Sequence, residues 1–302
     1  MAERQASKEA SRTDTIYNLN RGDVDGERER LADNHFKVWL PLTVDLLPPH
    51  ILSSLETANL GRAPRIADVA TGSGIWLISL AQIIPQGSEL YGFDLDGLKM
   101  PQSQRSEVSF NFMEHDVLKP FPAELRGTFD LVHVILKPFP AELRGTFDLV
   151  HVRLLALGLK KDDWDVAVTN MRELLLPGGW LLWEDMSDLF IRFYPLSRAY
   201  EEFWWVTMQH DAKVGRDRLM PMGLLKKLKK LGFQNCEQKI FNSWAADDSV
   251  RDEATSGIMH GGEETVNTME DVTRIEAELK RDVEEKGCRV GFDFVWNWGQ
   301  RA

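Results

Sequence analysis

The chain has few cysteines and no long apolar run. Among its 302 residues only Cys236 and Cys288 are cysteines, which is too few and too far apart for a disulfide framework or a metal site. Apolar runs such as residues 75–84 are much shorter than a membrane span. We therefore predict reduced thiols, no bound metal and a cytoplasmic location, with a nuclear location as the alternative.

Positive charge is also scarce. The chain holds 36 Lys and Arg against 47 Asp and Glu, a formal net charge of −11 at pH 7. Basic surface is needed to bind phosphates, so this charge argues against general affinity for nucleic acid or anionic lipid. The basic cluster at 226–230 is interleaved with leucines at helical spacing, and we interpret it as the solvated face of an amphipathic helix. We expect neither nucleic acid nor a membrane as partner, and no feature indicates a protein partner.

Buried apolar runs alternate with amphipathic segments from residue 65 onward. This alternation predicts an α/β fold with a parallel sheet, in which ligands bind at the carboxyl ends of the strands. We expect strands at the following ranges: 65–70, 89–95, 108–114, 146–152, 177–185 and 290–298. Helices are expected at 75–84, 162–175 and about 266–283.

The chain shows no low-complexity linker, so we expect a single domain over 15–302. Its sheet core begins at about residue 62, and two regions, about 15–60 and 190–225, form cap elements. Residues 1–14 are polar without an apolar stretch, so we expect a mobile tail and no secretory signal.

The segment ADVATGSGIW carries the clearest chemical signal. Asp68 ends a strand, and Gly72 and Gly74 stand in the turn that leads into a helix. Glycines let the backbone approach a ligand closely, and a helix N-terminus offers free N–H groups to an anion. Asp94 ends the second strand, where a carboxylate can bind both hydroxyls of a ribose. Asp116 follows the third strand, within reach of an adenine amino group.

A dinucleotide-binding fold expects a third glycine three residues after Gly74, beside the pyrophosphate. This chain has Leu77 there. We therefore favour a nucleotide without a pyrophosphate, and S-adenosylmethionine (SAM) is the natural candidate. An NAD-dependent oxidoreductase is the disfavoured alternative, and a degenerate site that binds nothing also stays open.

With these residues the chain resembles the class I SAM-dependent methyltransferases. DVATGSG resembles the first motif of the family, YGFDLD the second, NFMEHDV the third and FDLVHVRLL the fourth, while LLLPGGWLLWED resembles the Pro-Gly-Gly turn and fifth strand. The sequences of these motifs are most similar to those of fungal methyltransferases of secondary metabolism related to the velvet-complex regulator. The resemblance implies a Rossmann-like seven-stranded, mostly parallel sheet with the last strand antiparallel. It also implies methyl transfer from SAM to a small-molecule natural product, or alternatively a regulatory or inactive protein of this fold that acts through partners.

The resemblance also implies contacts to the cofactor. They fall on Asp68, Gly72, Gly74, Asp94, Leu95, Asp116 and Val117. Tyr17 and His35 match a tyrosine and a histidine that lie near the cofactor and substrate in the fungal relatives. Ala70 replaces the first glycine of the motif, and we expect it to be tolerated if its φ is negative.

Methyl transfer from a sulfonium mainly requires alignment, and a general base is needed only for a protonated acceptor. His151 and Arg153 follow the fourth strand and point toward the ligand-binding edge, so we expect both at the cofactor. His151 is a candidate base because its ordinary pKa suits that role, and simple packing beside the methionine moiety is the alternative. His210, below the aromatic helix, is a second candidate.

Three further residues are candidates for the substrate side. Glu184 ends the fifth strand, where it could bind an amine or could be a solvated acid. Trp204 and Trp205 belong to an aromatic helix that could roof an apolar pocket. Adjacent helical residues cannot all face one way, so part of this cluster is expected in the core.

One stretch, LKPFPAELRGTFDLVHV, occurs unchanged at 118–134 and 136–152. A methyltransferase sheet has one position for the strand it contains, so we interpret the repeat as an accidental tandem insertion or a gene-model error that could impair activity. We predict that 146–152 forms the strand, because Arg153 then follows it directly. The first copy would lengthen the preceding connection, where insertions cost least.

Overall fold

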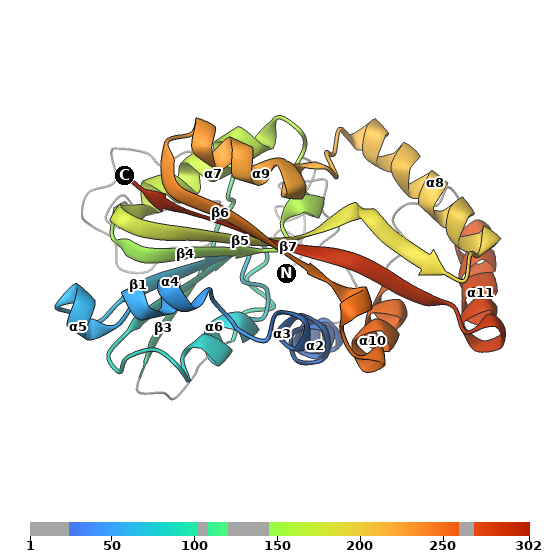
Figure 1. Cartoon of the computed structure of the whole chain (residues 1–302), viewed down its shortest axis with the longest axis horizontal. Helices are drawn as coiled ribbons and strands as arrows, with labels where there is room; N and C mark the ends of the chain where they lie inside the picture. The colour runs from blue at the N-terminus through green and yellow to red at the C-terminus, as the bar shows by residue number, and fades with distance from the viewer. Residues whose placement is uncertain (1–23, 102–107, 120–144, 260–268) are drawn as a thin grey trace, which may run out of the picture.

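The structure is a computed structural model that describes residues 24–101, 108–119, 145–259 and 269–302. Within these residues the centre is a seven-stranded sheet of order β3-β2-β1-β4-β5-β7-β6 (Figure 1). Its strands are β1 (Arg65–Val69), β2 (Glu89–Asp94), β3 (Ser109–Glu114), β4 (Phe147–Arg153), β5 (Leu175–Tyr194), β6 (Phe233–Asn242) and β7 (Arg289–Arg301). β7 runs antiparallel to both β5 and β6, while the pairs from β3 to β5 are parallel. The expected Rossmann-like sheet with an antiparallel last strand is confirmed.

The helices before β4 lie at the N-terminus and in the first crossover. They are α2 (Val24–Asp33), a π-helical turn η1 (Asn34–Trp39), α3 (Leu40–Thr43), α4 (Pro49–Ser54), α5 (Thr57–Leu60) and α6 (Ile75–Leu80). Those after β4 are η3 (Ala156–Gly158), α7 (Asp163–Leu174), α8 (Arg198–Val214), α9 (Met220–Lys230), η4 (Ser243–Ala245), α10 (Asp248–Met259) and α11 (Met269–Lys286). In the described part of the chain, no helix combines the length and apolar character needed to cross a membrane.

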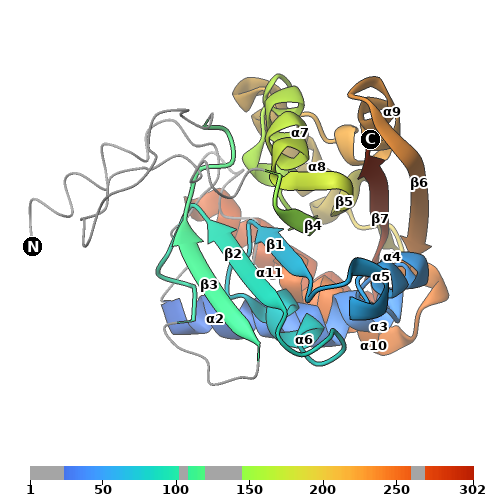
Figure 2. The same ribbon diagram turned by 90° about the vertical axis from the view of Figure 1, so that its left-hand side faces the viewer.

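Each face of the sheet is covered by helices, as Figures 1 and 2 show. α7 and α9 pack on one face, where Trp164 stacks on Trp183 with ring centroids 5.1 Å apart. α3, α4, α6 and α10 lie on the other face, whose core includes Trp39, Trp76 and Phe294. The segment around the basic cluster forms α9 as expected, an amphipathic helix with Leu224 and Leu228 fully buried.

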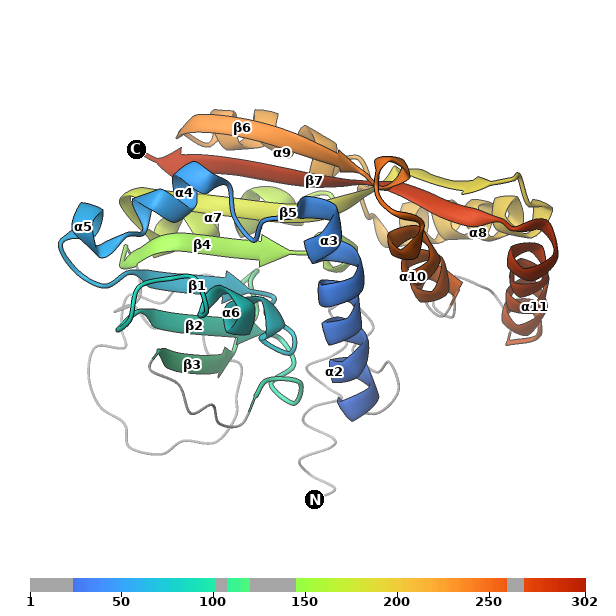
Figure 3. The same ribbon diagram turned by 60° about the horizontal axis from the view of Figure 1, so that its bottom comes forward.

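β5 and β7 extend together beyond the other strands toward α8 and α11 (Figures 1 and 3). The expected fifth strand at 177–185 was too short, because β5 reaches Tyr194 by pairing antiparallel with β7 up to Arg289. We call this extension, together with α8, η4 and α11, the arm. The cap expected at 190–225 therefore begins as a strand.

The second copy of the repeated stretch supplies β4. This strand pairs with β1 on one side and β5 on the other, and all of Phe147–Val152 is buried. The prediction that 146–152 would form the strand is thus confirmed. The first copy lies outside the described residues except for Leu118 and Lys119.

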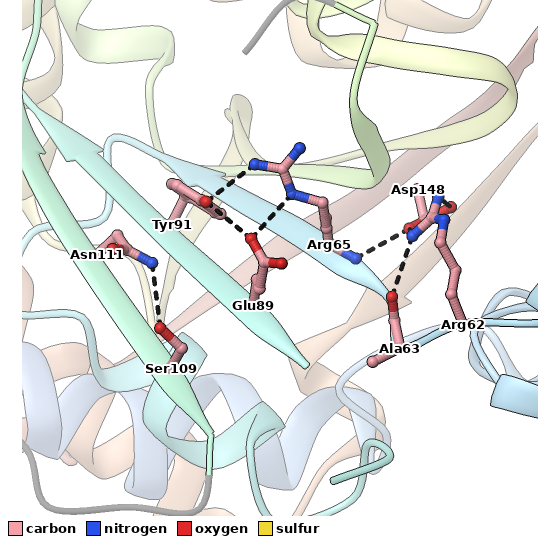
Figure 4. Close-up of polar contacts among 8 residues, drawn as sticks. All are labelled: Arg62, Ala63, Arg65, Glu89, Tyr91, Ser109, Asn111 and Asp148. Atoms are coloured by element: carbon pink, nitrogen blue, oxygen red, sulfur yellow. Dashed lines mark hydrogen bonds and ion pairs between the residues drawn. The ribbon is translucent and has the colours of Figure 1, made fainter. Parts of the chain in front are cut away.

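The amino ends of the strands are held by an ionic network (Figure 4). Asp148 accepts two hydrogen bonds of 2.9 Å from the guanidinium of Arg62 and a third from the backbone N–H of Arg65. The Arg65 side chain bonds in turn to Glu89 and Tyr91. These contacts stabilise the edge of the sheet opposite the expected ligand site. A substitution in this network can therefore serve as a control for a substitution at that site.

Candidate functional site

A glycine turn joins β1 to α6 at the carboxyl edge of the sheet. The φ angles of Gly72 and Gly74 are +56° and +73°, in the left-handed region that glycine adopts without strain. The amide of Gly72 donates a 2.8 Å hydrogen bond to Oδ2 of Asp94, and Oδ1 of Asp94 accepts one of 3.0 Å from Asp96. The glycine turn and the acidic end of β2 thus meet at this edge of the sheet. Burial raises the pKa of Asp94, and these two N–H donors oppose the rise.

Ala70 is the exception in this turn. Its φ is +62°, so the condition under which we expected the substitution to be tolerated is not met. A methyl side chain in the left-handed region costs about 1 kcal/mol relative to glycine, because Cβ crowds the following carbonyl. The turn therefore carries local strain at this position.

Asp68 lies at the centre of a buried network behind the turn. Oδ2 of Asp68 accepts a 2.7 Å hydrogen bond from the Thr71 hydroxyl, and Oδ1 lies 2.7 Å from Nδ1 of His151. The other ring nitrogen of His151 lies 3.5 Å from Oε1 of Glu184. The imidazole also stacks on Trp76, with ring centroids 3.6 Å apart and planes inclined by 5°. These contacts tie together β1, the glycine turn, α6, β4 and β5.

The charges in this network determine the protonation of His151. Burial alone would lower its pKa, but Glu184 and Asp68 together raise the pKa of His151 above its ordinary value. Burial lowers the pKa of Arg153, and the same two carboxylates oppose that shift. Two buried carboxylates thus face two cationic groups, the fully buried imidazole of His151 and the half-buried guanidinium of Arg153.

His35 carries the network into the N-terminal helices. Nη1 of Arg153 donates a 3.0 Å hydrogen bond to Nδ1 of His35, so the ring proton lies on Nε2, which donates over 2.8 Å to Oγ of Ser79. Burial, followed by the charges of Arg153 and His151, lowers the pKa of His35 to about 3, and the ring is neutral. His35 lies in the π-helical turn η1, where the Leu40 amide bonds to its carbonyl oxygen, an irregularity frequent at functional sites.

The residues expected near an adenine follow β3 and β2. Asp116 is half-buried, and its Oδ1 accepts a 3.0 Å hydrogen bond from the amide of Leu118. The carbonyl of Val117 accepts a 2.6 Å hydrogen bond from the Asn170 side chain of α7. Leu95 is half-buried just past Asp94. These residues lie at the same edge as the glycine turn, in the positions expected from the strand order.

The substrate-side candidates do not form one cluster. Glu184 is 3% exposed and faces His151, so it is not a solvated acid. Trp204 lines a cavity in the arm, while Trp205 is 66% exposed on α8. His210 is half-buried on the same helix.

Tyr17 lies outside the described residues. Thr71, Trp76 and Ser79 have clear contacts in this network and were not predicted as part of the site. Trp76 stands within the glycine motif, so its position could have indicated a role, whereas no signal in the sequence marks Ser79 as the partner of a histidine 44 residues away.

The strand order, the glycine turn at the end of β1 and the acidic end of β2 together define the fold of class I SAM-dependent methyltransferases. No family model matches the chain. The methyltransferase grgD of a Penicillium species is 28% identical over 251 residues, which cover 80% of this chain and 78% of that protein. The secondary metabolism regulator LAE1 of Gibberella fujikuroi is 25% identical over 281 residues, covering 88% and 79%. The predicted resemblance to fungal methyltransferases and regulators of secondary metabolism is confirmed.

The same fold recurs in a solved structure. Phosphoethanolamine N-methyltransferase 2 of Haemonchus contortus, in complex with S-adenosyl-L-methionine, superimposes with a TM-score of 0.51 at 14% identity. The match covers 94% of this chain and 58% of that one, so this chain spans less than two thirds of that protein. At this identity the likeness concerns the fold alone.

Proposed function

We propose that the protein is a SAM-dependent methyltransferase that acts on a small-molecule natural product. The observation that carries the proposal is the hydrogen bond between the Gly72 amide and Asp94, which joins the glycine turn to the acidic end of β2. The fold and the similarity to fungal methyltransferases support the same conclusion.

The residues at this edge fit the cofactor. Each oxygen of Asp94 accepts one backbone N–H, and a carboxylate oxygen has two lone pairs, so each oxygen retains one acceptor position for a ribose hydroxyl. A Cβ on Gly72 would lie 3.1 Å from Leu31 of α2, so the space at the turn depends on the missing side chain. Leu77 is fully buried where a dinucleotide fold needs its third glycine, which supports SAM over NAD.

Each residue of the edge then has a role. We assign Asp94 to the ribose, Asp116, Val117 and Leu95 to the adenine side, and the turn at Asp68, Ala70, Gly72 and Gly74 to the amino-acid end. Tyr17 remains a proposed contact on the strength of the resemblance alone. SAM would supply an electrophilic methyl group, and the protein would align the acceptor with it.

His151 contributes in this proposal by holding Asp68 and Arg153 in place. Its ring is fully buried between Trp76, Asp68 and Glu184, which favours positioning over contact with an acceptor. His35 and Glu184 are positioning residues by the same reasoning, because both contact the network. His210 stays the candidate base for an acceptor that must lose a proton.

Calorimetry tests the cofactor assignment. We expect binding of SAM and of its demethylated product S-adenosylhomocysteine, and none of NADH. Asp94→Asn should weaken SAM binding by about tenfold or more, because a charge-assisted hydrogen bond to each hydroxyl is lost. Asp148→Asn is the matched control, since it removes the same charge at the opposite edge; it should lower stability by about 1–3 kcal/mol and leave SAM affinity unchanged. Absence of heat with both SAM and S-adenosylhomocysteine would overturn the proposal.

A turnover assay distinguishes a methyltransferase from a regulatory protein of the same fold. The protein is incubated with SAM labelled on the methyl group and with metabolite extracts of its source organism. Label in an extracted small molecule supports the methyltransferase. The alternative, favoured by the similarity to a secondary metabolism regulator, predicts SAM binding with no labelled metabolite and stable association with a protein partner.

A further inference from the structure

The arm contains an aromatic cavity of about 560 Å³ that the methyl-transfer proposal does not use. A volume of this size suits a small molecule. The cavity is lined by Phe193, Tyr194, Leu196, Tyr200, Glu201, Trp204 and Trp244. It lies between the end of β5, the first turns of α8 and η4, on the arm seen in Figure 1.

One wall is a ladder of stacked rings. Tyr200 stacks on Phe193 at a centroid distance of 4.8 Å and 12° between planes, and Trp204 continues the stack at 6.4 Å and 16°. Phe193 and Tyr200 are buried, so the ladder is anchored in the protein and Trp204 is its more exposed end. A flat aromatic ligand can extend such a stack with favourable offset geometry.

Another part of the lining, at Trp244, depends on a glycine. A Cβ on Gly291 of β7 would lie 1.8 Å from atoms of the Trp244 indole, so the indole lies directly against the strand backbone. The guanidinium of Arg251 lies 5.5 Å from the centre of the same ring, and the Trp244 amide bonds to the Asn242 side chain. Trp244 is therefore held in place by three neighbours while 37% of its surface remains exposed.

The charge of the residues that line the cavity favours a positively charged ligand. Among the described residues that line it, Glu201 is the charged one, and its side chain is exposed. Arg251 and Arg218 lie over the rings of Trp244 and Trp204, and both are engaged by carboxylates: Arg251 bonds to Asp248, and Arg218 shares Asp211 with Arg216. Electron-rich aromatic faces and a carboxylate both attract a positively charged group. We propose that this cavity binds small planar aromatic molecules that carry a cationic amine.

The cavity is separate from the site at the strand ends. Glu184 pairs with Trp296 of β7, and Phe193 pairs with Val290, six residues further along that strand. At 3.4 Å per residue this places the cavity about 20 Å from the strand ends. Methyl transfer requires the reacting atoms to approach to about 3 Å, so a small ligand in the arm is out of reach of that chemistry.

Calorimetry with two indoles tests the proposal on the full chain. Tryptamine is a planar aromatic with a cationic amine, and indole-3-propionate has the same ring with a carboxylate. We expect tryptamine to bind and indole-3-propionate to bind at least threefold more weakly. Equal affinity for both, or no binding of tryptamine, would overturn the proposal.

Variants assign the binding to the cavity. Glu201→Gln should weaken tryptamine binding by about threefold to fivefold, the upper part of the range for an exposed ion pair, and leave the affinity for indole-3-propionate unchanged or higher. Glu237→Gln, an equal change of charge on exposed β6, is the matched control and should change nothing. Trp204→Ala should lower tryptamine affinity by more than tenfold, while SAM affinity stays as in the wild type.

Two other outcomes would contradict the assignment. If Trp204→Ala and Glu201→Gln leave tryptamine affinity unchanged, the amine binds elsewhere. If sedimentation shows a dimer that Trp204→Ala dissociates, the aromatic surface is covered by a second copy of the chain and not by a small ligand. Because SAM affinity is measured on the same variants, failure of this proposal is distinguishable from failure of the methyltransferase assignment.

Discussion

Nδ1 of His151 lies 2.7 Å from Oδ1 of Asp68, and this buried pair connects the centre of the sheet to the glycine turn. The second oxygen of Asp68 accepts the hydroxyl of Thr71, which belongs to the turn itself. The position of the turn therefore depends on a histidine that the cofactor need not touch. The charge on that histidine is maintained by the two carboxylates beside it.

His151→Gln should lower the free energy of unfolding by about 3 kcal/mol at pH 6, because it leaves two buried carboxylates facing one cation. The loss should depend on pH. The pKa of His151 is raised in the folded state, so its stabilising contribution is complete below the ordinary value of 6.5 and is lost as the pH rises through the folded pKa. Urea unfolding of both proteins between pH 6 and pH 9 measures the difference.

Thr71→Val is the control for this series. It removes the other hydrogen bond to Asp68 but no titrating group, so its cost should not vary over the same pH range. A pH-independent cost for His151→Gln would show that the ring is neutral and contradict the paired-charge arrangement.

His35 should show the opposite dependence on pH. Its pKa is about 3 in the folded protein against an ordinary 6.5, so the unfolded chain binds a proton first as the pH falls. The stability that rests on the neutral ring is present above pH 6.5 and declines toward pH 3, by about 2 kcal/mol at pH 5. In His35→Gln, whose amide can accept from Arg153 and donate to Ser79, the decline between pH 6.5 and pH 4.5 should be smaller. Ser79→Ala keeps the imidazole and should keep the decline, so an equal slope in all three proteins would count against the assignment.

Much of the fold could be predicted because its central strands are buried on both faces. β1, β2 and β4 lie within one residue of their expected ends, since continuous apolar runs mark strands of a covered parallel sheet. β6 was not predicted from its residues because, within the described part of the chain, it is an edge strand that pairs with β7 and is largely exposed. The length of β5 depends on pairing with residues more than 90 positions away, which no local pattern records.

The contacts of the site likewise include some that the sequence could predict and some that it could not. The meeting of Gly72 and Asp94 could be predicted, because neighbouring parallel strands end at one edge. The bond between Arg153 and His35 spans 118 positions and depends on how the N-terminal helices pack, so the sequence carried no direct signal of it. The sign of φ at Ala70 was likewise undetermined until the turn was seen.

Ala70→Gly should raise the free energy of unfolding by about 1 kcal/mol, less the entropy that glycine adds to the unfolded chain. The reason is the φ of +62°, which glycine adopts without the crowding of Cβ. Chemical denaturation measures the change. Ala67→Gly is the matched control: this alanine is buried in β1, so the same substitution there should destabilise the protein by about 0.5–1 kcal/mol. A destabilised Ala70→Gly would mean that the strain is absent.

Removing residues 118–135 should leave a folded protein with unchanged SAM affinity. The deletion joins Val117 to Leu136, so an identical Leu-Lys pair again follows Val117, and β4 keeps its own residues Phe147–Arg153. The connection between β3 and β4 becomes 18 residues shorter, which reduces the entropy lost on closing it by roughly 0.7 kcal/mol. Thermal unfolding and calorimetry with SAM measure both effects.

Deleting residues 136–153 is the matched comparison, because it removes the second copy and keeps the first. The first copy is then left to form β4, but Ile135 takes the place of Arg153, which now bonds to His35. That variant should fold less stably, by about 1–3 kcal/mol for the lost buried contacts of the guanidinium. If the first deletion abolishes folding while the second does not, the strand of the sheet is formed by the first copy.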